Sequence, residues 1–144
     1  MKIKQLSVFL ENKPGHLSAI CKKLAEANIS ILTLSLADTQ QFGILRLIVQ
    51  DWEKAMKLLQ EAGCVVRLTE VVATEIEDRP GGLAAILEIL ENANLNVEYM
   101  YAFTFHAADK AILVFRFDNP DAAVATLQEK GVNLFDSVDL YNLN

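Results

Sequence analysis

Hydrophobic and polar residues alternate along several short segments of the chain, and a helical period appears between them. From Ile3 to Leu10 the two kinds alternate, as in a strand with one buried face. In residues 15–27 apolar side chains recur every three or four positions, which predicts a helix with one buried face. Two more apolar segments, 30–38 and 43–50, predict a pair of strands joined by a turn at 40–43.

A second helix and a short strand complete this half of the chain. Asp51 is a typical N-cap residue, and Gly63 predicts the end of the helix at Ala62. Val65–Thr69 is short and rich in β-branched residues, which predicts a strand. The resulting order is strand, helix, strand, strand, helix, strand.

The sequence contains an internal repeat. Residues 11–20, ENKPGHLSAI, are matched by residues 77–86, EDRPGGLAAI, at an offset of 66 positions. The offset later becomes 68, which indicates two extra residues in a turn at 106–110. The second copy therefore predicts the same order of elements, with strands near 71–77, 97–105, 110–117 and 134–140.

This order is that of the ferredoxin-like, or split βαβ, motif. The predicted fold class is α+β: two tandem ferredoxin-like βαββαβ units, each with an antiparallel sheet and helices on one face. The predicted domains are 1–69 and 70–144, with no Gly, Pro or Ser-rich linker between them.

Composition and charge exclude several classes of protein. With 52% hydrophobic and 22% charged residues the chain supports a packed core, and its apolar runs are too short to span a membrane. The N-terminus lacks the pattern of a signal peptide, so we expect a cytoplasmic protein. The net charge is −6, and no arginine-rich stripe is present, which disfavours nucleic-acid binding.

No set of residues predicts catalysis, a cofactor or a metal. The two histidines, His16 and His106, are not equivalent in the two copies, and neither has an evident partner. Cys21 and Cys64 lack metal-ligand spacing and are expected to be reduced packing residues. We therefore expect a protein that is not an enzyme.

The candidate chemistry lies where the first strand of each copy meets its helix. We call residues 12–15 the first corner and residues 78–81 the second corner. A helix that begins after Gly15 or Gly81 exposes unpaired N–H groups, which favour a carboxylate. The side-chain oxygen of Asn12 or Asp78 accepts hydrogen bonds from an ammonium group. A simpler interpretation is that Pro-Gly forms a tight turn and that Asn or Asp caps the helix.

The repeated pattern Asn/Asp-x-Pro-Gly-x-Leu, followed by NISI at 28–31 or NLNV at 94–97, resembles the ACT domain over essentially all 144 residues. The resemblance implies an allosteric, regulatory module that binds an amino-acid effector at the corners and at a domain interface. It also implies action with an enzyme of amino-acid metabolism or another regulator in trans. The ligand-binding positions it implies are Asn12, Gly15, His16, Leu17, Ser30, Asp78, Gly81, Gly82, Leu83 and Asn96. A homodimer is expected separately, because the edge strands of two small domains leave apolar surface to cover.

Two other functions stay open from the residues. The first is an interaction module that pairs through exposed sheet edges without any metabolite. The second is a small hydrolase similar to acylphosphatase, which has the same topology. The second is disfavoured because the corners carry Lys13 and Arg79, not an arginine loop suited to phosphate.

Overall fold

The computed structural model of the chain describes residues 1–38, 41–107 and 109–143. The predicted turns at 40–43 and 106–110 include residues outside these ranges, and the side chains of residues 38 and 104–107, including His106, also lie outside the description. The elements are β1 Ile3–Glu11, α1 His16–Glu26, β2 Ile31–Asp38, β3 Phe42–Val49, α2 Trp52–Glu61, β4 Val65–Glu77, α3 Gly82–Asn92, β5 Val97–Ala107, β6 Lys110–Phe117, α4 Pro120–Glu129, β7 Leu134–Phe135 and α5 Ser137–Tyr141.

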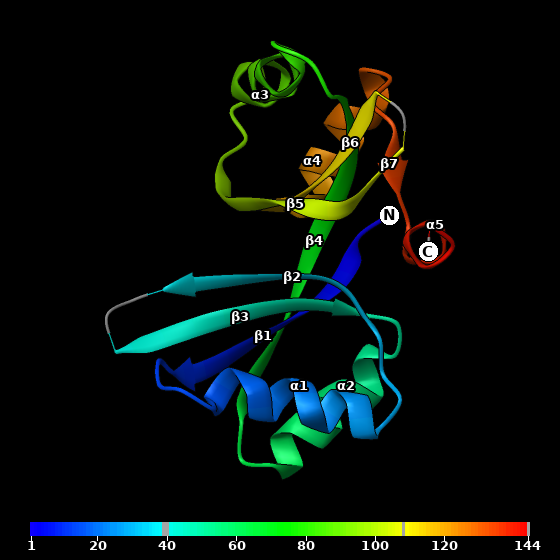
Figure 1. The fold of residues 1–144 in the computed structure, drawn as a ribbon. Coiled ribbons are helices and arrows are strands. Elements are labelled where there is room, and N and C mark those ends of the chain that lie inside the picture. The colour runs from blue at the N-terminus through cyan, green and yellow to red at the C-terminus, as the bar shows by residue number, and fades with distance from the viewer. Residues whose placement is uncertain (39–40, 108, 144) are drawn as a thin grey trace. The chain divides into compact units, whose positions relative to one another are not determined.

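The chain forms two compact units (Figure 1). The first unit is Lys4–Thr69, and the second unit is Glu70–Asn144 together with Met1–Ile3. Within the second unit, the Lys2 Nζ lies 2.9 Å from Asp121 Oδ1 and 3.3 Å from Glu70 Oε2. Hydrogen bonds to Asp121 and then to Glu70 raise the pKa of Lys2 above its ordinary value.

The first unit has the strand order β2-β3-β1-β4, with β3 antiparallel to both β1 and β2. Figure 1 shows α1 and α2 on one face of these strands, and the two helices pack against each other. The Asp51 side chain caps α2 by accepting a hydrogen bond from the Lys54 N–H at 3.2 Å, as predicted. The core between sheet and helices includes Leu6, Leu24 and Leu59, each 0 or 1% exposed.

The second unit has the corresponding order β5-β6-β4-β7, and α3 packs against α4. The Asn119 side chain accepts a hydrogen bond from the Ala122 N–H at 3.1 Å, and Pro120 fits the first turn of α4 because it has no N–H to pair. Phe115 and Phe117 stack in the core with their ring centroids 5.5 Å apart. The predicted fold class, two antiparallel ferredoxin-like units, is therefore confirmed.

Two predictions about strands are wrong. The strand expected at 134–140 has only two residues, because Asp136 and Asp139 form a capping box that starts α5: each side chain accepts a hydrogen bond from the other residue's N–H. The helical turn also places Leu140 in a fully buried position. The strands expected at 65–69 and 71–77 form one continuous strand, since no turn residue interrupts them. Along the described parts of the chain, no helix is long and apolar enough to cross a membrane.

Candidate functional site

The first corner is a tight turn that leads from β1 into α1. The Lys13 N–H donates to the Glu11 carbonyl at 2.9 Å, and the His16 N–H donates to the Lys13 carbonyl at 3.3 Å. Gly15 has φ 92°, a left-handed conformation that side chains with a Cβ rarely adopt. The Asn12 N–H donates to the Gln41 carbonyl at 3.0 Å, which ties the corner to the beginning of β3.

The second corner has the same backbone pattern between β4 and α3. The Arg79 N–H donates to the Glu77 carbonyl at 2.9 Å, and the Gly82 N–H donates to the Arg79 carbonyl at 3.0 Å. Gly81 has φ 91°. The Asp78 N–H donates to the Asp109 carbonyl at 2.7 Å, in place of the bond that Asn12 makes in the first unit.

Asn12 and Asp78 do not cap the helices. The N-cap residues are Gly15 and Gly81, which have no side chain with which to cap α1 or α3. The half of the simpler interpretation that assigns a cap to Asn or Asp is therefore wrong, while the Pro-Gly turn is present. The first-turn N–H groups of α1 consequently keep the partial positive charge that favours an anion.

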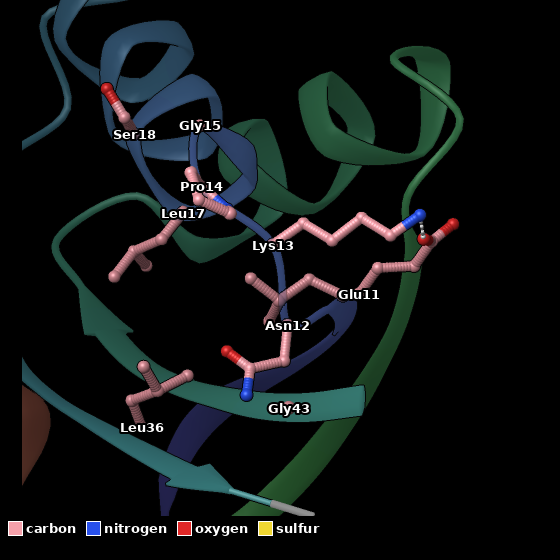
Figure 2. Close-up of a pocket in the computed structure, with 10 residues that line it drawn as sticks. Glu11, Asn12, Lys13, Pro14, Gly15, Leu17, Ser18, Leu36 and Gly43 are labelled. Atoms are coloured by element: carbon pink, nitrogen blue, oxygen red, sulfur yellow. Dashed lines mark ion pairs between the residues drawn. The ribbon is translucent and has the colours of Figure 1, made fainter. Parts of the chain in front are cut away.

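A cavity of about 610 Å³ opens beside the first corner (Figure 2). Pockets for small molecules in proteins span roughly 300–1,000 Å³, so this volume is sufficient for an amino acid. Asn12, Gly15 and Leu17, three of the predicted ligand-binding positions, line it. Its full lining is Leu10, Glu11, Asn12, Lys13, Pro14, Gly15, Leu17, Ser18, Leu36 and Gly43.

The charged side chains at the cavity neutralise each other. Lys13 Nζ lies 2.9 Å from Glu11 Oε2, and this bond lowers the pKa of Glu11 below its ordinary value. In Figure 2 this ion pair stands on one side of the Asn12 amide, and the side chains of Leu17 and Leu36 stand on the other. The first-corner cavity thus has a polar rim and an apolar side.

The groove at the second corner differs in place and in lining. It has a volume of about 300 Å³ and lies against Gly81 and Gly82, whereas neither Asp78 nor Leu83 lines it. Its charged lining includes Glu77, whose carboxylate pairs with Arg79 and lies 3.9 Å from the Lys110 Nζ. This groove corresponds by repeat to a cavity of about 440 Å³ in the first unit that is lined by His16, Lys23 and Cys64.

Two predicted positions lie far from the corners of their own units. Ser30 is exposed and directly precedes β2, at the opposite end of the sheet from the Leu10–Gly43 pair. The seven steps from Ile31 to Asp38 span about 23 Å at the rise of a strand. Asn96 has the equivalent position before β5, where its N–H donates to Asp118 Oδ1 at 3.2 Å. Neither residue shares a site with the corner of the same unit.

The sequence reasoning missed five lining residues outside the first corner: Leu10, Glu11, Ser18, Leu36 and Gly43. Leu36 and Gly43 lie on strands that follow α1, and register alone brings them to the corner, since Gly43 pairs with both Leu10 and Asp38. The glycine was interpreted as a turn residue. The repeat gave a signal against the turn interpretation. At an offset of 68, Gly43 in the first copy is matched by an alanine, Ala111, in the second.

The described residues outside the corners add no metal chemistry. In residues 1–38, 41–107 and 109–143, no three His, Cys, Asp or Glu side chains are grouped so as to hold a metal ion. Cys21 and Cys64 are free thiols of intermediate exposure. The cavity at the first corner is therefore the feature whose lining best suits a small organic ligand.

Comparison with known families identifies the family of the two units that contain these corners. The family described as an ACT domain pair matches residues 1–144. The chain belongs to this family of ACT domain pairs. The resemblance inferred from the repeated corners is thus confirmed, and the pair is a module of regulatory type. A comparison with curated proteins finds no match.

Solved structures extend this comparison. Protein BT0572 from Bacteroides thetaiotaomicron is 41% identical with a TM-score of 0.92, over 99% of this chain and 98% of that one. The ligand-free regulatory subunit of aspartate kinase from Thermus thermophilus is 14% identical with a TM-score of 0.62, over 88% and 91% of the two chains. Aspartate kinase from Synechocystis is 20% identical with a TM-score of 0.58, and the match covers 94% of the ACT pair but 28% of the enzyme. The fold is shared with both a separate subunit and a longer enzyme.

Proposed function

We propose that this ACT domain pair is a non-catalytic regulatory module that binds an amino acid in the first-corner cavity. The observation that carries the proposal is the cavity of about 610 Å³ in which the uncapped start of α1, the Asn12 amide and an apolar wall meet. These three features match the three parts of an amino acid: its carboxylate, its ammonium group and its side chain.

Each part has a partner with suitable chemistry. The N–H groups of Leu17 and Ser18, in the first turn of α1, bind the carboxylate. Gly15 permits the ligand to approach the backbone because it has no Cβ. The Asn12 side-chain oxygen accepts a hydrogen bond from the ammonium group. The apolar side of the cavity receives the ligand's side chain.

The second corner is a weaker candidate for the same role. Asp78, Gly81, Gly82, Leu83 and Asn96 stay predicted ligand-binding positions, but the groove at this corner is smaller and does not include the Asp78 side chain. We propose one principal site per chain. His16 and Ser30 are not part of it within the first unit, so any contact from them comes from another copy.

The proposed regulation acts on another chain in the cytoplasm, such as an enzyme of amino-acid metabolism, and involves a homodimer. The β2 strand supports a dimer because it lies at one end of the first unit's strand order and exposes Leu34 and Leu36 by 45% and 48%. A second copy on this strand would bury apolar surface and would also cover the cavity that Leu36 lines. Sedimentation of a monomer at micromolar concentration, with and without ligand, would contradict the dimer.

The same exposed leucines favour the second candidate function, an interaction module that pairs through its sheet edges without a metabolite. A thermal-shift screen against the twenty amino acids separates the two functions, because a ligand bound only by the folded protein raises its apparent stability. Amino-acid regulation requires a selective rise that Asn12→Ala removes. Assembly that is indifferent to all twenty would support the interaction module.

A further inference from the structure

One glycine, Gly43, lines the apolar side of the first-corner cavity. Gly43 pairs with Leu10 across β1 and β3, so an added Cβ would point to the same face as Leu10. That Cβ would stand 3.3 Å from Leu36 Cδ1 and 3.8 Å from Leu10 Cδ2. Gly43 thus lies directly against the two leucine side chains, and an added Cβ would press on Leu36.

The surroundings of this space suit an uncharged, apolar group. Leu10, Leu17 and Leu36 line the cavity on this side, and Pro14 adds a further apolar surface. The charged lining side chains, Glu11 and Lys13, are paired with each other at 2.9 Å. A ligand's ammonium or carboxylate placed among the leucines would lose its water without gaining a partner, which is costly.

The two units differ at the positions that flank this space. The second unit has Ala111 at the position equivalent to Gly43 and Ala102 at the position equivalent to Leu36. In its sheet, Ala111 pairs with Ile76 and Ala102 pairs with Leu113. The corresponding pairs in the first unit are Leu10–Gly43 and Leu36–Leu45. A glycine between large side chains occurs in one copy, and a smaller pair of alanines occurs in the other.

From this arrangement we infer that the first-corner cavity selects amino acids with aliphatic side chains and that Gly43 sets the size of the side chain it accepts. The inference rests on the proposed function, because it names the ligand class of the same site. Leu10 and Leu36 contact the aliphatic group, and a Cβ at position 43 would press on Leu36 and push its side chain into the room left for the ligand.

The size of the expected selectivity follows from apolar burial. Each buried methylene group strengthens binding by about fourfold, so leucine should bind roughly fifty-fold more tightly than alanine. Valine should lie between them. Aspartate and lysine should bind more weakly than alanine, because their charged groups would be desolvated without a partner.

The test is isothermal titration calorimetry of the full chain with leucine, valine, alanine, aspartate and lysine. In Gly43→Ala the added Cβ should weaken leucine binding by about tenfold while changing alanine binding much less. In Leu36→Ala the cavity should widen and the preference should shift from leucine toward methionine and phenylalanine. Ala111→Gly is the matched control in the second unit and should leave all affinities unchanged.

The outcomes distinguish this inference from the proposed function. Tight binding of aspartate or lysine, or equal loss of leucine and alanine in Gly43→Ala, would overturn the aliphatic selectivity while leaving an amino-acid site in place. Failure of all twenty amino acids to bind would overturn both. Circular dichroism shows whether Gly43→Ala folds, and Leu36→Ala carries the test if it does not, since Leu36 is about half exposed.

Discussion

Helices α1 and α3 both begin after a Pro-Gly turn whose glycine has φ 92° in one unit and 91° in the other. The space beside the two turns is nevertheless different. The first corner borders a cavity of about 610 Å³ with an apolar side and another of about 440 Å³. The second corner borders a groove of about 300 Å³, which corresponds by repeat to the cavity of about 440 Å³. The same backbone is therefore combined with two different surroundings.

One difference lies at a variable position within the repeated motif. His16, which directly follows the first corner, is matched by Gly82 in the second copy, where an added Cβ would clash with the Glu77 carbonyl oxygen. The second turn thus approaches its own strand more closely than a side chain at position 82 would allow. An ACT-type corner supplies the backbone groups, while the neighbouring strands decide whether a ligand-sized space is left.

The largest expected effect concerns this close approach. Gly82→Ala places a Cβ against backbone that cannot move aside, so the free energy of unfolding should fall by about 3 kcal/mol. Urea denaturation measures the change. The matched variant His16→Ala, at an exposed position, should change stability by less than about 0.5 kcal/mol. Equal effects at the two positions would show that the turns do not differ in this way.

The second prediction concerns what the corners share. Gly15→Ala and Gly81→Ala should each lower the free energy of unfolding by about 1 kcal/mol, because alanine is strained at positive φ. An added Cβ would meet no atom within 4 Å at either position, so the backbone alone determines the cost. Denaturation of both variants should therefore give similar values, and a difference of more than about 1 kcal/mol would contradict the equivalence of the two turns.

A third prediction separates the corners by ligand affinity. Asn12→Ala should weaken amino-acid binding by about tenfold, since it removes a hydrogen-bond acceptor for the ammonium group. Asp78→Ala should leave the affinity nearly unchanged, because Asp78 does not line the groove at its corner. Calorimetry on both variants makes the comparison. A loss of amino-acid affinity in Asp78→Ala alone would show that the principal site lies in the second unit.

The smallest expected effect concerns the rim of the first-corner cavity. Lys13→Met should raise the pKa of Glu11 toward the ordinary value of 4.5, because the bond to Lys13 is the main cause of the lowered pKa. The stabilisation from this pair is complete above the ordinary carboxyl pKa and is lost as the pH falls through the lowered folded value. An NMR titration of the Glu11 carboxyl measures the shift, and an unchanged pKa would show that the pair does not form in solution.

Local patterns were sufficient to predict much of the fold. The strand at β1, the helical period of α1 and the cap at Asp51 each depend on neighbours within a few residues, and the structure confirms them. The expected alternation of buried and exposed positions in β1 is not observed, because Gln5 and Ser7 are buried and Phe9 is exposed. The prediction failed at residues 134–140, where a capping box between Asp136 and Asp139 starts a helix. Both the strand and the helix were locally possible there, and the burial of Leu140 accompanies the helix.

The sequence by itself determined that the chain is a repeated ACT-type unit and that each copy has a Pro-Gly corner, because motif, period and cap are properties of adjacent residues. The tertiary structure decided which strand residues line the cavity at the first corner. Leu36 and Gly43 reach the first corner only through the antiparallel register of β1, β2 and β3. Strand pairing joins residues that are far apart in the chain, so no local pattern records which side chains will meet.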